Sequence, residues 1–315
     1  MKVLMFGWEF PPHISGGLGT ACYGLTKALY NKDVEIIFVV PKAFGDEDTS
    51  QIKILSASQV VNTLSQKESE KIDQKVSFVQ INSTIIPYIG QQDYYNIIHS
   101  QTQEKKITTN LKFDFKGGYG ENLLEEVERY AFVAASIAKQ NDFDVIHAHD
   151  WLCYKAGVIA KQISNKPLIV HVHATEYDRS GENINQDVYR VEKYGMDNAD
   201  KIVAVSDFTR NIVINKYHQN PDKVITIHNG VEQTISKEYS NKTKNKKIVS
   251  FIGRITFQKG PDYFIEAAEK VLRKDKNFLF IMAGKGDMLN KMVALVAKKR
   301  ISKNFLFTGF LKGEE

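Results

Sequence analysis

Two patterns of apolar and polar residues alternate along the chain. Short β-branched and apolar runs, typical of buried strands, are separated by longer stretches whose apolar residues recur at helical spacing. We predict strands at residues 2–6, 35–40, 145–148, 167–173, 201–205, 224–227, 248–253, 278–283 and 304–308. We predict helices at residues 20–30, 121–139, 152–163, 208–217, 261–273 and 287–299. This alternation is typical of parallel, doubly wound α/β domains whose strands are covered on both faces.

Two stretches interrupt the rhythm and divide the chain. Residues 91–120 are polar with scattered aromatic residues and end in a glycine-rich run, which indicates a long loop and a candidate substrate segment. Residues 233–247 contain five lysines among serine, asparagine and threonine, the composition of a linker. We therefore predict a first domain over residues 1–232, this linker, and the first half of a second doubly wound domain over residues 248–315.

Composition narrows the class of protein. Hydrophobic residues make up 43% of the 315 residues and charged residues 25%, which is enough for two domain cores and excludes wholesale disorder. The 42 basic residues exceed the 37 acidic ones by five, a surplus too diffuse to predict a nucleic-acid partner. No apolar run is long enough to span a membrane, and Cys22 and Cys153 form no disulfide or metal pattern. We expect a cytoplasmic protein.

A glycine-rich loop follows the first predicted strand. Residues 8–20 read WEFPPHISGGLGT and lead directly into a predicted helix. Glycines such as Gly16 and Gly17 allow backbone N–H groups to approach a phosphate, while a helix N-terminus supplies partial positive charge. The loop lacks the spacing of a dinucleotide-binding fingerprint, so a plain strand-to-helix turn remains an equal interpretation.

Two His-x-His tripeptides stand at the ends of neighbouring predicted strands. His147 and His149 end one strand, and His171 and His173 end the next. Residues two apart in a strand share a face, so each pair projects together at the edge where open α/β sheets bind ligands. A zinc site is one interpretation, although the spacing fixes no third ligand. The other is that these are satisfied histidines within a sheet and that Asp150 caps the following helix.

A basic loop opens the second domain. Arg254 and Lys259 follow a predicted strand that ends in glycine, and a helix begins at Pro261. The rigid fork of arginine and the mobile charge of lysine together suit a diphosphate, and two solvated cations are the alternative. Gly284 lies in a second glycine turn after the next strand, where it would line the same crevice.

Several short motifs carry a family resemblance in combination. They are Ser15-Gly16-Gly17-Leu18, His149-Asp150-Trp151, His173, His228-Asn229-Gly230-Val231, and Gly253-Arg254 followed by Lys259-Gly260. Together they resemble the retaining GT-B glycosyltransferases, and the opening Trp8–Pro12 run is similar to the glycogen and starch synthase-like group, of the family 4/5 type. The resemblance implies two Rossmann-like domains facing across a cleft. It also implies a transferase that moves glucose from a nucleoside-diphosphate glucose to an α-glucan.

The resemblance assigns the donor to a set of basic and glycine residues. Arg254 and Lys259 would bind the diphosphate of an ADP-, UDP- or GDP-sugar and stabilise its leaving charge. Gly16 and Gly17 would approach that diphosphate, and Gly284 would line the donor crevice. No metal and no other cofactor is expected in this class.

The resemblance assigns sugar contacts to the first domain. His173 would contact the transferred sugar near the reacting carbon, and Glu9 and Asp150 would bind sugar hydroxyls of the glucan or other glycan acceptor. Family members normally continue beyond this length, so we expect a C-terminally truncated chain. The alternatives are a transferase for another polysaccharide or glycoside, a non-catalytic glycan-binding protein, and a metal-dependent hydrolase built on the histidines.

Overall fold

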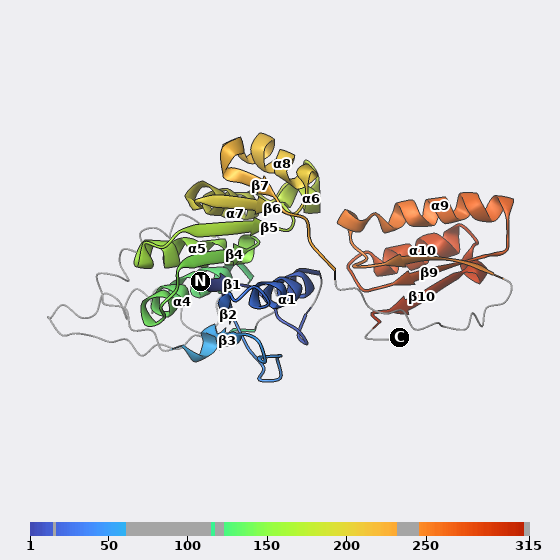
Figure 1. Cartoon of the computed structure of the whole chain (residues 1–315). Helices are drawn as coiled ribbons and strands as arrows, with labels where there is room; N and C mark the ends of the chain where they lie inside the picture. The colour runs from blue at the N-terminus through green and yellow to red at the C-terminus, as the bar shows by residue number, and fades with distance from the viewer. Residues whose placement is uncertain (15–16, 61–114, 117–122, 232–245, 312–315) are drawn as a thin grey trace, which may run out of the picture. The chain divides into compact units, whose positions relative to one another are not determined.

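A computed structural model describes residues 1–14, 17–60, 115–116, 123–231 and 246–311 (Figure 1). Nearly all of the predicted loop at residues 91–120 and of the predicted linker at residues 233–247 lies outside the described residues. The chain divides into two compact units. The first comprises Met1–Glu176 and Asn185–Glu232, and the second comprises Tyr177–Ile184 and Gln233–Glu315. The two units are described separately.

The first unit is built on a seven-stranded parallel sheet with the order β3-β2-β1-β4-β5-β6-β7. The strands are β1 (Lys2–Phe6), β2 (Glu35–Val40), β3 (Lys53–Ser56), β4 (Val145–His149), β5 (Leu168–Val172), β6 (Lys201–Ala204) and β7 (Val224–Thr226). The strand order reverses at the neighbouring strands β1 and β4. In open α/β sheets, ligands bind at the carboxyl ends of the strands beside such a reversal.

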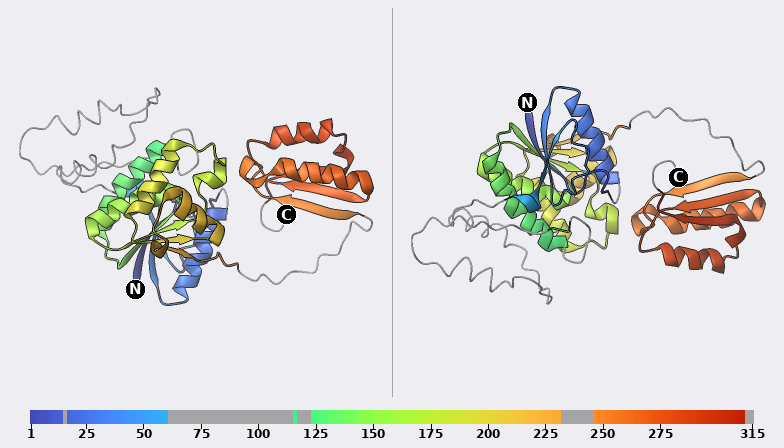
Figure 2. Two further views of the ribbon diagram at one scale, coloured as in Figure 1. Left: turned by 90° about the horizontal axis from the view of Figure 1, so that it is seen from above. Right: turned by 90° about the horizontal axis from the view of Figure 1, so that it is seen from below.

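Helices cover both faces of this sheet, with α1 (blue) on one side and α4 and α5 (green) on the other (Figure 2). The helices of this unit are α1 (Gly17–Tyr30), α4 (Leu123–Gln140), α5 (Trp151–Ser164), α7 (Gln186–Asn198) and α8 (Asp207–Tyr217), with 3₁₀ turns η1 (Ala57–Gln59) and η2 (Pro221–Lys223). The short helix α6 (Glu176–Ser180) begins at Glu176 of this unit, and its other residues are assigned to the second unit. The hydroxyl of Ser206 accepts a hydrogen bond from the Thr209 N–H and so caps α8.

One helix contact requires a glycine and reveals the orientation of β4. A Cβ added to Gly157 of α5 would lie 2.8 Å from Leu168 Cδ1 and 2.9 Å from the Ala148 Cβ. Ala148 therefore faces α5. Because successive side chains of a strand alternate between faces, His147 and His149 project from the opposite face of the sheet.

The second unit contains a three-stranded parallel sheet in the order β10-β9-β8. Its elements are β8 (Lys247–Ile252), η3 (Phe257–Lys259), α9 (Pro261–Lys274), β9 (Phe278–Ala283), α10 (Leu289–Lys298), η4 (Ser302–Asn304) and β10 (Phe305–Gly309). Lys247, predicted as the last linker residue, is the first residue of β8, and its N–H donates to the Asn277 carbonyl. The buried residues of this core are Ile255, Ile265, Ala268, Leu272, Phe280, Met282, Met292, Val296 and Ile301.

The predicted α/β fold and every predicted strand and helix are confirmed, with small shifts at their ends. The sequence patterns missed β3, α6 and α7. On α7, Glu192 lies among the buried residues, where its Oε2 accepts hydrogen bonds from the Tyr217 hydroxyl and the Glu176 N–H. A charged residue on the buried face conceals the helical period of α7.

Tyr130 of α4 connects that helix to the sheet. Its hydroxyl donates toward the carbonyl of Gly7, just beyond β1, at 3.0 Å, and toward the carbonyl of Val39, within β2, at 2.8 Å.

We expect Tyr130→Phe to lower the free energy of unfolding by about 1–3 kcal/mol, because both buried carbonyls lose this partner. Urea unfolding followed by tryptophan fluorescence measures this. Tyr30→Phe, at a residue 46% exposed, is the control, and an equal loss in both variants would contradict the assignment.

Candidate functional site

The loop after β1 brings a carboxylate to the start of α1. Trp8, Glu9 and Phe10 are buried, and Glu9 Oε1 accepts a hydrogen bond from the Gly19 N–H at 3.3 Å. A Cβ added to Gly19 would lie 2.4 Å from Ile14 Cγ2 and 3.1 Å from Glu9 Cγ, so this position requires glycine. The sequence reasoning missed Gly19, although it is the third glycine of the GGLG run.

Of the two glycines predicted to bind the donor phosphate, the structure describes only Gly17. Gly16 lies outside the described residues. Gly17 is the first residue of α1 and is exposed, with no atom within 4 Å of an added Cβ. The position of Gly17 is therefore open among the described residues, whereas the Gly19 N–H of the same turn already donates to Glu9.

The two histidine pairs come together on one face of the sheet. His149 and His171 are paired in the β4–β5 register, and His149 Nδ1 lies 3.0 Å from His173 Nε2. Ring centroids of neighbouring members lie 4.3 Å apart for His147 and His149, and 4.4 Å apart for His171 and His173. The two members of each pair lie together, as their spacing predicts, and the β4–β5 register brings the two pairs together, which the spacing alone did not predict.

Cys22 joins this cluster from α1. Its sulfur lies within 4.8 Å of ring nitrogens of His149 and His173. The thiol is buried and free, as predicted. Burial raises its pKa well above the usual value, with the charges of Asp150 and Glu9 adding to the effect, so the group is a neutral thiol at pH 7.

Asp150 has a different role from the predicted helix cap. It occupies the N-cap position of α5, but its side chain makes no capping hydrogen bond. Its Oδ1 instead accepts from the N–H groups of His173 at 2.7 Å and Ala174 at 3.4 Å. Its own N–H donates to the His171 carbonyl at 2.9 Å. With φ at 57°, unusual for a residue other than glycine, Asp150 connects the end of β4 to the loop after β5.

The cluster histidines are neutral at physiological pH. Burial lowers the pKa of His171 to about 3, with the neighbouring His173 contributing, and burial lowers the pKa of His173 to about 4. The pKa values of His147 and His149 lie well below the usual range because both rings are buried beside other histidines. Each ring therefore offers one N–H donor and one nitrogen lone pair.

In the second unit, backbone contacts hold two strand-end loops together. A Cβ added to Gly284 would lie 1.8 Å from the Gly253 carbonyl oxygen, and one added to Gly286 would lie 2.2 Å from that of Ile255. The Ile255 N–H donates to the Lys285 carbonyl at 2.9 Å. The loops after β8 and β9 approach this closely only because glycines stand at these two positions.

Arg254 and Lys259 lie exposed on the first of these loops. Lys259 ends η3, directly before Gly260 and the N-terminus of α9. Among the described residues, neither side chain has an ion-pair or hydrogen-bond partner. A cation directly before a helix N-terminus is suited to bind an anionic group, and Arg254 adds a second exposed positive charge to the same loop. In the second unit, Arg254 and Lys259 therefore lie on one loop, and Gly284 approaches Gly253, the residue before Arg254. Glu9, Asp150 and His173 belong to the first unit.

Two family models match adjacent parts of the chain. Glycosyltransferase Family 4 matches residues 118–234, and glycosyl transferases group 1 matches residues 232–315. The chain is a glycosyltransferase with the GT-B fold. The residues matched by the first family model include His149, Asp150 and His173, and those matched by the second include Arg254 and Lys259.

Individual relatives agree with this assignment. The glycosyltransferase is 24% identical to an uncharacterized glycosyltransferase of Methanocaldococcus jannaschii and 21% identical to a glycogen synthase of Mycobacterium tuberculosis. Both matches cover 100% of this chain, and 70% and 69% of the relatives. Among solved structures, Anabaena HepE in complex with UDP-glucose has a TM-score of 0.61 at 16% identity, covering 99% of this chain and 70% of HepE. Sucrose-phosphate synthase from Thermosynechococcus elongatus has a TM-score of 0.66 at 12% identity, with 99% and 71% covered.

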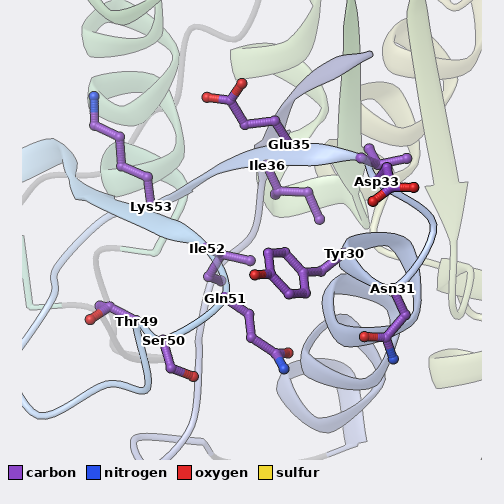
Figure 3. A pocket seen from close by; sticks show the side chains of 11 residues that line it. Tyr30, Asn31, Asp33, Glu35, Ile36, Thr49, Ser50, Gln51, Ile52 and Lys53 are labelled. Carbon is purple, nitrogen blue, oxygen red and sulfur yellow. The ribbon is translucent and has the colours of Figure 1, made fainter.

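A hollow of about 720 Å³ lies elsewhere on the first unit of this transferase (Figure 3). Tyr30 at the end of α1, Glu35 at the start of β2 and Lys53 at the start of β3 line it. The strands begin here, so the hollow lies at the opposite edge of the sheet from His173 and Asp150. None of the predicted site residues lines it. Among the described residues, no helix is long and apolar enough to cross a membrane.

The lowered histidine pKa values predict acid sensitivity of the first unit. Between about pH 4 and the ordinary value of 6.5, the unfolded chain binds protons that the folded cluster does not. Stability is therefore complete above about pH 6.5 and is lost as the pH falls. The loss is at most about 1.4 kcal/mol per pH unit for each histidine. Urea unfolding at pH 7.5 and pH 5 measures it.

Two histidine variants test this prediction, one at a buried histidine and one at an exposed histidine. His171→Gln should reduce the pH dependence because it removes one buried imidazole. His218→Asn should leave it unchanged, since His218 is exposed and asparagine tolerates its left-handed conformation. Equal pH dependence in both variants would show that other groups cause the acid sensitivity.

Proposed function

We propose that this protein is a retaining glycosyltransferase that moves glucose from a nucleoside-diphosphate glucose to an α-glucan. The observation that carries the proposal is the pair of exposed cations Arg254 and Lys259, which have no partner among the described residues and lie on the loop that leads into α9. The glycogen synthase relative and the UDP-glucose complex of HepE support the choice of donor and acceptor class.

In this proposal, Arg254 and Lys259 promote the departure of the nucleoside diphosphate. Cleavage of the glycosyl–phosphate bond leaves negative charge on the diphosphate, and preorganised cations and N–H dipoles stabilise that charge. Arg254 offers a planar fork of donors, Lys259 a mobile point charge, and α9 its first N–H groups. These groups replace the charge that a metal ion supplies in other transferases, so we propose that turnover requires no metal or other cofactor.

Sugar recognition falls to the first unit in this proposal. His173 is neutral, and Asp150 fixes the backbone at His173 while His149 contacts its ring. A neutral, oriented imidazole can donate a hydrogen bond to a sugar hydroxyl without repelling the developing positive charge at the anomeric carbon. Glu9 and Asp150 are proposed to bind acceptor or donor hydroxyls. Gly16 and Gly17 are proposed to approach the diphosphate.

The acceptor is the least determined part of the proposal. Relatives over part of the chain include a D-inositol 3-phosphate glycosyltransferase of Corynebacterium diphtheriae, 26% identical over 191 residues. A transferase for another polysaccharide or for a small glycoside is therefore the second candidate. Screening UDP-, ADP- and GDP-glucose against glycogen and small polyols separates the two by which pair releases nucleoside diphosphate.

Arg254→Ala and Lys259→Ala should each lower kcat by about 10²–10³-fold, because each removes fixed charge from the leaving group. Release of nucleoside diphosphate from the donor is measured with glycogen present and with EDTA added. Lys270→Ala, at an exposed position of α9, is the control and should retain activity. Full activity of both loop variants would overturn the proposed donor site. Absence of turnover with every donor would overturn the transferase proposal for this chain.

His173→Ala should lower kcat on the order of 100-fold through loss of a hydrogen bond to the reacting sugar. The variant should keep its urea unfolding midpoint near that of the unmodified protein, since His173 lies beyond the end of β5 and is only partly buried. His218→Asn serves as the control. If His173→Ala unfolds instead, the histidine has a core role and the assignment to the sugar is wrong.

A further inference from the structure

Three histidines of the cluster have ring nitrogens that nothing in the described part of the chain satisfies. They are His147 Nε2, His149 Nε2, and both nitrogens of His171. His149 is 0% exposed and His171 is 5% exposed. The expectation that these are satisfied histidines within the sheet is therefore wrong for the described residues. A buried polar atom without a partner costs free energy, which makes such a site receptive to a ligand.

The β4–β5 pairing brings these nitrogens close together. His147 and His149 share a face because they are two residues apart, and His171 lies opposite His149 in the parallel register. One ring nitrogen from each of the three lies within 4.8 Å of the other two. Tetrahedral zinc holds nitrogen ligands at about 2.0–2.1 Å. The ring planes of His147 and His171 are parallel to within 1°, so binding of one ion requires the rings to rotate until their lone pairs converge.

The chemistry of the set selects the ion. We propose that His147, His149 and His171 bind a Zn²⁺ ion through three imidazole nitrogens. Imidazole suits zinc and neighbouring transition metals, whereas Mg²⁺ and Ca²⁺ prefer oxygen ligands. The ion plays no part in the proposed sugar transfer, which Arg254 and Lys259 serve.

The other nitrogen of His149 gives the site an outer partner. His149 Nδ1 lies 3.0 Å from His173 Nε2. When Nε2 of His149 binds an ion, Nδ1 carries the proton, and this N–H donates a hydrogen bond to His173 Nε2. Metal-binding histidines characteristically donate their second N–H in this way, which orients the ring.

A second set of possible zinc ligands also contains His149. The two sets therefore cannot bind an ion at the same time. Cys22, His149 and His173 also place ligand atoms within 4.8 Å of one another. One feature opposes it. His173 Nε2 already contacts His149 Nδ1, whereas the nitrogens without a partner in the described residues belong to His147, His149 and His171. The set of three histidines is therefore preferred.

Isothermal titration calorimetry of the chelator-treated protein with ZnCl₂ at pH 7.5 tests the proposal. We expect one equivalent of zinc, no binding of Mg²⁺, and at least about 100-fold weaker zinc binding in His147→Gln and His171→Gln. His218→Asn, at an exposed histidine, should bind zinc as the unmodified protein does. No zinc binding, or unchanged affinity in both cluster variants, would overturn the proposal.

X-ray absorption of the zinc-loaded, unmodified protein gives a test that needs no variant to fold. Three imidazole ligands and no sulfur are expected. A sulfur ligand, together with loss of binding in Cys22→Ala, would overturn the proposal in favour of the second set. Neither measurement needs a sugar donor, so failure of the proposed transferase activity leaves this test intact.

Discussion

The bridge that Asp150 makes between the ends of β4 and β5 is the constraint on which the first site depends. Its N–H donates to the His171 carbonyl, and its carboxylate accepts from the N–H groups of His173 and Ala174. The residue pays for this position with a positive φ of 57°. The bridge adds to the β4–β5 pairing, which ends at His149 and His171, and holds the backbone of His173 just beyond it.

The same strand pair creates an unusual electrostatic environment. Four imidazoles share one sheet face, and burial keeps all of them neutral. The face therefore presents lone pairs and N–H donors without net charge, a combination that can hydrogen-bond sugar hydroxyls at His173 and hold a soft cation deeper in the cluster. These two uses fall on different atoms, and His149 connects them.

The candidate site of the second unit is charged and exposed, whereas the histidine cluster of the first unit is neutral. Its chemistry is carried by exposed, permanently charged groups on a loop whose path is set by glycines in the neighbouring turn. The close approach of Gly284 to the Gly253 carbonyl and of Gly286 to the Ile255 carbonyl holds the loop, on which Arg254 and Lys259 have no partner among the residues that the structure describes. Charge that is not neutralised by the protein is available to a diphosphate.

The sequence by itself determined the α/β class, the strands and the main helices, because hydrophobic periodicity is a local property that each element carries in its own residues. It also located Arg254, Lys259 and His173 at strand ends, since strand boundaries follow from the same pattern. Only the tertiary structure decided what Asp150 does, since its partners lie more than 20 residues away across two strands. Likewise, the helix period of α7 was concealed by Glu192, whose burial depends on Tyr217. The unpartnered nitrogens of the histidine cluster appear only when register and burial are known, because spacing along one strand cannot show what faces it from the next.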